Sequence, residues 1–253
     1  MFFWTCWLRN RYRLVAYVVI GCALVLLGTL PVTMKSVHSH WVWVHPKTVV
    51  DAREIWRFGI EHVLFAMVFL LLFSAADLGS LGVGESAARK EYDFLLTRPR
   101  ARRHFVWTAW LAGLSQLCVL TLIPLVVAIT TLYFLTSRIY PAPLWPRSLG
   151  AFILSLLVFS GAFALSVATG SSRSGFELAL SLLIINYVAQ QMSWNFAFWA
   201  ASHGRPFSFP IYGEGAYGLV NDPHLRYIVL SVMVAATAVL PFLAQFGFER
   251  KDL

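Results

Sequence analysis

Long apolar runs, separated by short polar segments, dominate this chain. Each run approaches or exceeds the ~20 residues that a helix needs to cross the hydrocarbon core of a bilayer. Unbroken apolar runs of this length, without the alternation of a half-buried strand, predict membrane-spanning helices. The six predicted spans cover residues 14–34, 60–78, 105–136, 149–169, 176–198 and 225–246.

The first run, 14–34, is longer than the apolar core of a secretory signal peptide. We therefore expect it to be retained as the first span, with the basic residues that precede it on the inside. The polar, aromatic stretch 35–59 is expected to be an external loop whose tryptophans lie at headgroup level. Pro124 in the third run removes one backbone hydrogen bond, which predicts a kink.

Composition supports the membrane interpretation. Of 253 residues, 58% are hydrophobic and only 13% are charged, too few to cover a soluble domain of this size. No polar segment is long enough for a core of its own, so residues 1–253 are predicted to form a single transmembrane domain. Cys6, Cys22 and Cys118 have neither metal-ligand spacing nor the pattern of a disulfide framework.

The net charge of +8 is explained by the rule that basic residues are retained on the cytoplasmic side of a membrane, so nucleic acid is not an expected partner. Twelve of the 20 basic residues fall inside if both termini, the segment 84–104 and the turn 170–175 are cytoplasmic. We therefore expect an all-α, multi-pass protein of the inner (cytoplasmic) membrane with both termini in the cytoplasm.

The segment 84–104, between the second and third spans, is strongly charged yet carries an apolar stripe. Ala88, Tyr92, Leu95 and Leu96 recur at helical spacing. A short amphipathic helix of this kind lies in the membrane interface and presents its polar face to the cytoplasm. A soluble protein could bind there.

Four stretches resemble the permease subunit of type-2 ABC exporters. The sequence Glu-Tyr-Asp-Phe-Leu-Leu-Thr-Arg-Pro at 91–99, followed by Arg102 and Arg103, is similar to the family's acidic helical stretch before span three. The turn at 171–175 and the tail at 248–253 also match, and the Gly/Pro-rich segment 203–224 resembles the family's external hairpin. The chain departs from the family at Lys90-Glu91, where a Gly-Thr pair is frequent, and near Ala109, where a lysine is frequent.

The resemblance implies six spans and a coupling helix at 84–104 that docks on a separate ATPase subunit. It implies two copies of that ATPase, which bind ATP and Mg, and a second permease copy as a homo- or heterodimer in the lipid bilayer. This chain has no phosphate-loop motif, so we expect no enzymatic activity and no cofactor of its own. The residues expected to dock on the ATPase are Glu85, Arg89, Glu91, Asp93, Arg102 and Arg103.

Two further groups of polar residues carry open alternatives. Amides on the fifth span either line a polar pathway or hold helices together, because an amide in hydrocarbon needs a partner; they are Asn186, Gln190, Gln191 and Asn195. Imidazoles in the first external loop could bind zinc or copper, although their spacing fits no metal motif; they are His38, His40 and His45.

Three other classes of protein are alternatives to this interpretation. An intramembrane enzyme lacks a recognisable catalytic motif, since neither GxSxG nor HExxH is present. An ion-coupled transporter requires ionisable residues near mid-membrane, whereas Glu61, Asp77 and Glu177 lie near predicted span ends. A non-transporting scaffold or sensor on the same fold stays possible, because a fold does not fix a function.

Overall fold

The computed structural model describes residues 2–41, 52–81, 99–136, 144–181, 184 and 223–249, and every regular element among them is an α-helix. The prediction of an all-helical fold is therefore confirmed for these residues. The labelled helices are α1 (Phe2–Arg9), α2 (Arg11–Trp41), α3 (Ala52–Leu81), α6 (Pro99–Thr136), α7 (Leu144–Thr169) and α10 (Pro223–Glu249). A further helix covers 172–181.

Among the described residues, two helices are long and apolar enough to cross a membrane: Arg103–Phe134 within α6 and Leu149–Thr169 within α7. At 1.5 Å per residue, the 32 residues of the first would extend about 48 Å, more than the ~30 Å of a hydrocarbon core. Met67–Leu81 and Ser231–Gly247 are shorter apolar stretches.

The observed helices differ in extent from the predicted spans. α2 and α3 continue well into the stretch 35–59 that we expected to be a loop, and leave only 42–51 between them. α6 begins at Pro99, so the last part of the segment 84–104 belongs to this long helix instead of a separate interfacial one. Proline is favoured in the first turn, where its missing N–H costs nothing. α6 also continues through Pro124.

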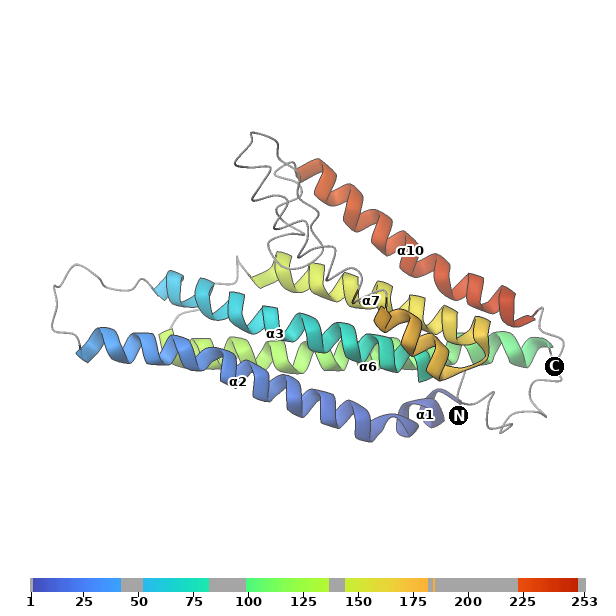
Figure 1. Cartoon of the computed structure of the whole chain (residues 1–253), viewed down its shortest axis with the longest axis horizontal. Coiled ribbons are helices and arrows are strands. Elements are labelled where there is room, and N and C mark those ends of the chain that lie inside the picture. The colour runs from blue at the N-terminus through green and yellow to red at the C-terminus, as the bar shows by residue number, and fades with distance from the viewer. Residues whose placement is uncertain are drawn as a thin grey trace.

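The long helices α2, α3, α6 and α7 run side by side, with α10 leaning against α7 (Figure 1). The end of α3, the start of α6 and the ends of α7 and α10 all lie at the same end of the bundle as α1 (Figure 1). We call this the arginine-rich end, because its described helix ends carry Arg9, Arg11, Arg13, Arg100, Arg102, Arg103 and Arg173.

α3 occupies the centre of the bundle and packs most closely against α7. Gly79 of α3 makes this approach possible: a Cβ built there would lie only 2.4 Å from the carbonyl oxygen of Phe159. Phe159 is fully buried and shares a core with Leu78 and Leu117. Many large apolar side chains outside this core are exposed, Phe134 to 78%, which suits helices in contact with lipid.

Candidate functional site

The structure describes few of the site residues predicted from sequence. Arg102 and Arg103 lie in the first turns of α6, and the Arg103 side chain is exposed. His38 and His40 belong to the last turns of α2, of which the backbone alone is described. The other predicted residues lie outside the described ranges: Glu85, Arg89, Glu91, Asp93, His45, Asn186, Gln190, Gln191 and Asn195.

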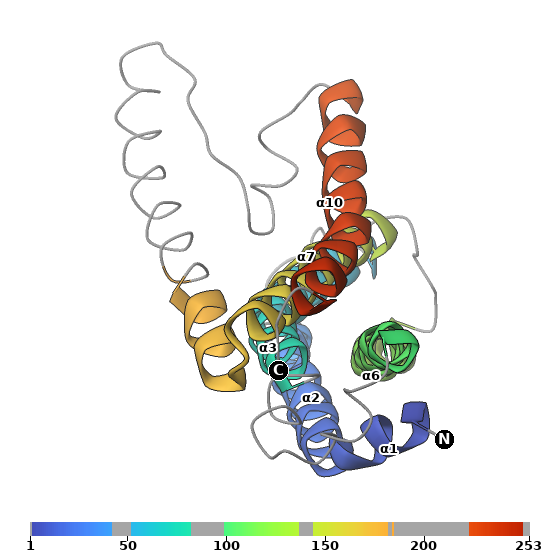
Figure 2. The ribbon, with the colours of Figure 1, turned by 90° about the vertical axis from the view of Figure 1, so that its right-hand side faces the viewer.

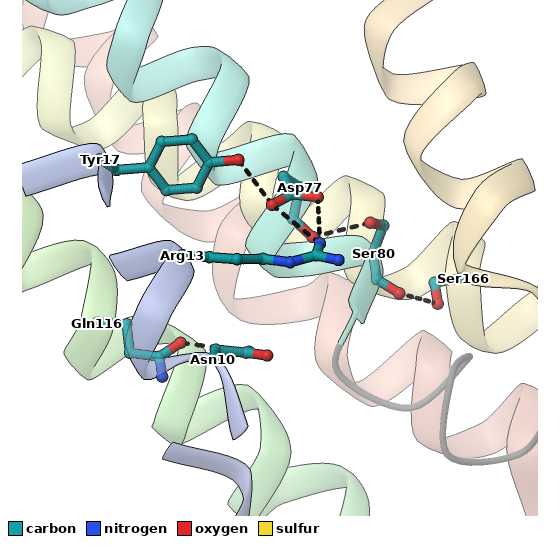
Figure 3. A network of polar contacts seen from close by, with 7 residues as sticks. All are labelled: Asn10, Arg13, Tyr17, Asp77, Ser80, Gln116 and Ser166. Atoms are coloured by element: carbon teal, nitrogen blue, oxygen red, sulfur yellow. Dashed lines mark hydrogen bonds and ion pairs between the residues drawn. The ribbon is translucent and has the colours of Figure 1, made fainter. Parts of the chain in front are cut away.

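An acidic side chain near the end of α3 forms the centre of a polar network at the arginine-rich end (Figure 3). Nη1 of Arg13 lies 3.1 Å from Oδ1 of Asp77 and 3.4 Å from Oδ2. The hydroxyl of Tyr17 donates to Oδ2 of the same carboxylate at 2.7 Å. We call Arg13, Tyr17 and Asp77 the Asp77 triad.

The register of two antiparallel helices brings the Asp77 triad together. Arg13 and Tyr17 are four residues apart on α2, so both side chains lie on one face of that helix. Asp77 faces them from α3, with its side chain 16% exposed and that of Arg13 52% exposed. A hydrogen bond to a charged group contributes about 1.5–3 kcal/mol, whereas a half-exposed ion pair adds about 1 kcal/mol or less. By these magnitudes, the hydrogen bond from Tyr17 stabilises the Asp77 carboxylate at least as much as the ion pair with Arg13 does.

The last turn of α3 is also tied to α7. The buried Ser166 hydroxyl donates to the backbone carbonyl oxygen of Ser80 at 2.6 Å (Figure 3). α3 ends at Leu81, so the Ser80 carbonyl is one of the last four of the helix, which accept no hydrogen bond from a backbone N–H of the same helix. Ser166 therefore caps the end of α3 from a neighbouring helix.

The short helix α1 is fixed to α6 by a second polar group. Nε2 of Gln116 donates to the backbone oxygen of Trp7 at 3.0 Å, and Nε1 of Trp7 donates to Oγ of Ser115 at 3.2 Å. Asn10, between α1 and α2, donates to Oε1 of Gln116 at 3.5 Å (Figure 3). Gln116 is fully buried, and these bonds satisfy its amide inside an apolar helix.

Replacing Gln116 with leucine should loosen α1 without emptying the core. The two side chains are similar in volume, but the backbone oxygen of Trp7 and the Asn10 amide lose their partner. We expect the free energy of unfolding in detergent micelles to fall by about 1 kcal/mol and trypsin to cleave after Arg9 or Arg11 sooner. Gln245→Leu is the matched control, because Gln245 lies on α10 and accepts a hydrogen bond from Trp107 of α6, away from α1. Equal cleavage at these arginines in both variants would contradict the conclusion that Gln116 fixes α1 to α6.

Two tryptophans of α6 form hydrogen bonds to α10 and α7. Nε1 of Trp107 donates to Oε1 of Gln245 on α10 at 2.8 Å, and its ring packs edge-on against Phe242. Nε1 of Trp110 donates to Oγ of Ser160 on α7 at 3.2 Å. In its first half, α6 is therefore hydrogen-bonded to α1, α7 and α10.

The turn predicted at 170–175 reverses the chain after α7. Gly170 has φ of 70°, a left-handed conformation that glycine adopts without strain and that ends helices. Ser171 caps the following helix, since its Oγ accepts from the backbone N–H of Ser174 at 3.4 Å. Arg173 and Glu177 then form an exposed i, i+4 ion pair at 2.7 Å. Their hydrogen bond raises the pKa of Arg173, which is charged in any case.

Most of the described polar groups form hydrogen bonds within a helix or between neighbouring helices. Serine and threonine hydroxyls on α6 and α7 mostly donate to backbone oxygens of their own helix, as Ser115 and Ser155 do. No group of three or more His, Cys, Asp or Glu that could hold a metal ion is found in the described part of the chain. The described contacts between helices therefore join α6 to α1, α7 and α10, and the end of α3 to α2 and α7.

Sequence reasoning placed Asp77 near a span end but did not pair it. Its partners are 60 and 64 positions away along the chain. A usable signal was present: an acidic residue near the end of the second apolar run, and an arginine and a tyrosine one helical turn apart at the start of the first. The contacts of α1 are also not predictable from the sequence pattern, which indicates only a basic segment before the first span.

Comparison of the chain with protein-family models, with curated proteins and with solved structures finds no match. The class is therefore defined by the fold: an all-helical chain, in its described residues, with two helices able to cross a membrane.

Proposed function

We propose that this chain is the permease subunit of an ATP-driven ABC exporter. In this proposal it has six spans in the inner membrane and works as a dimer with a second permease copy. Two separate ATPase subunits bind ATP and Mg. Each of them docks on the segment 84–104 of one permease copy. The chain itself carries no catalytic step.

The observation that carries the proposal is the position of the ends of α3 and α6. The segment 82–98 joins these two ends, and both lie at the arginine-rich end (Figure 1). Basic residues concentrate on the cytoplasmic side of membrane proteins. An ATPase in the cytoplasm would therefore reach the docking residues Glu85, Arg89, Glu91 and Asp93.

The long helix α6 connects the proposed docking segment to the helix bundle. Its 38 residues begin at Pro99, inside the segment 84–104, and continue without interruption to Thr136. Movement of an ATPase bound near Arg102 and Arg103 would therefore displace the part of α6 that precedes Pro124. Because the first half of α6 is hydrogen-bonded to α1, α7 and α10, these helices would follow it.

Charge reversal of Glu91 and Asp93 to lysine should abolish docking. Each reversal replaces an attraction by a repulsion of similar size, so we expect at least a tenfold loss of co-purified ATP hydrolysis activity. The full chain is purified by an affinity tag from its native host in mild detergent. ATP hydrolysis and the mass-spectrometric detection of a phosphate-loop chain are then measured together.

The control is Glu177→Lys, which reverses one exposed charge at the same end of the bundle but outside the docking segment. The proposal predicts unchanged ATPase recovery in this variant. Unchanged recovery in the double reversal, or a docking segment that is labelled from outside intact cells, would refute the proposal.

A further inference from the structure

The helix α1 lies across the bundle instead of along it. In the view along the long axis, α6 is seen end-on while α1 is seen lengthwise beneath it (Figure 2). α1 meets α2 at Asn10, whose carbonyl oxygen accepts the first bond of α2 from Leu14 at 2.9 Å. α1 is thus fixed crosswise at the level where the apolar run of α2 begins.

Only part of the apolar surface of α1 is covered by protein. Phe3, Trp4, Trp7 and Leu8 are related by one, four and five positions, so they lie on one arc of this eight-residue helix. Trp7 binds α6 through Ser115, whereas Trp4 is 61% and Leu8 42% exposed. The rings of Trp4 and Trp7 lie 5.9 Å apart, so the aromatic surface continues from the bundle outward.

Basic and aromatic side chains follow this arc directly. Arg11 is exposed, donates to the hydroxyl of Tyr12 at 2.9 Å and lies 4.7 Å from the centroid of that ring. Tyr12 is itself 74% exposed. Among the described contacts Arg11 has no acidic partner, whereas Arg13 pairs with Asp77 and Arg173 with Glu177.

We propose that α1 and Arg11 form a docking surface for anionic phospholipid. The apolar arc enters the boundary between headgroups and acyl chains, as tryptophan and leucine do on interfacial helices. Arg11 then lies at headgroup level and binds lipid phosphate, with Tyr12 beside it. The complementary charge, the crosswise orientation and the exposed aromatic surface all select a lipid surface. This inference requires the bundle to lie in a bilayer, but it does not depend on an ATPase.

The test measures the phosphatidylglycerol that stays bound to the full chain. The protein is reconstituted in phosphatidylcholine nanodiscs with and without phosphatidylglycerol, released gently, and examined by native mass spectrometry. Arg11→Gln should reduce the retained phosphatidylglycerol about fivefold, the effect of one arginine at an anionic surface. Arg11→Lys should retain most of it, because the charge is kept.

The matched control is Arg173→Gln, which removes one exposed arginine at the same end that is already paired with Glu177. Retention should change less than twofold in this variant. An equal loss in Arg11→Gln and Arg173→Gln would mean that only the overall charge matters, and would overturn the proposal. No loss in Arg11→Gln would do the same.

A second measurement tests the position of α1 independently of Arg11. A spin label is placed by Leu8→Cys in a variant whose native cysteines are replaced by alanine. Its accessibility to oxygen and to a water-soluble nickel complex reports its depth in the bilayer. We expect the label at the headgroup boundary, and deeper burial when phosphatidylglycerol is present. A label that is fully accessible to the nickel complex in both lipids would overturn the proposal, whatever the outcome of the ATPase experiments.

Discussion

Replacing Gly79 with alanine is expected to reduce the free energy of unfolding by about 3 kcal/mol. The new Cβ would lie 2.4 Å from the backbone oxygen of Phe159 and 3.1 Å from Cβ of Ala162. A side chain could rotate away, but a carbonyl within a helix cannot move without its helix. α3 and α7 must therefore separate, and the packing around Phe159 is lost with them.

Gly161→Ala is the control for this substitution. Gly161 also lies in α7, but a Cβ built there meets nothing within 4 Å. Alanine favours the helix by roughly 0.5–1 kcal/mol over glycine, so this variant should be as stable as the original chain or slightly more stable. Both are measured by chemical denaturation in the same detergent. If the two variants have the same free energy of unfolding, α3 and α7 do not approach each other as closely at Gly79 as described.

Replacing Asp77 with alanine should cost about 2 kcal/mol of unfolding free energy. The hydroxyl of Tyr17 loses its charged acceptor, and Arg13 loses its counter-ion. The half-exposed position of Arg13 keeps the cost below that of a fully buried pair. Asp77→Asn should be milder, because an amide oxygen still accepts from Tyr17.

A double-mutant cycle separates the ion pair from the tyrosine bond. Arg13→Gln and Asp77→Asn, alone and together, should give a coupling of about 1 kcal/mol or less. Tyr17→Phe should show a coupling with Asp77→Ala at least as large. Glu177→Ala, which removes an exposed carboxylate from a local pair, should have no measurable effect. Additive effects throughout the cycle would show that the Asp77 triad does not act as a unit.

Apolar patterning was sufficient to predict the helical class and the approximate place of most helices. α7 ends at Thr169, where the predicted fourth span ends, because Gly170 stops the helix locally. α6 reaches Thr136, the last residue of the predicted third span. Such boundaries depend on a few neighbouring residues and are readable from them.

Contacts between helices could not be predicted from the sequence in the same way. The pairing of Asp77 with Tyr17 depends on the rotation and register of two helices, which many sequences with the same hydropathy would not share. The extension of α2 to Trp41 was missed for a different reason. Polar residues after Met34 look like a loop in a hydropathy pattern, but a helix can continue into water beyond an apolar core.

The bond from Ser166 to the last turn of α3 limits how that helix can come apart. Helix ends ordinarily fray, because their final carbonyls have no partner within the helix. Here the final turn is anchored twice, to α7 through Ser80 and to α2 through Asp77. Tension on the residues after Leu81 would thus be passed to both neighbours at once instead of being dissipated by unwinding.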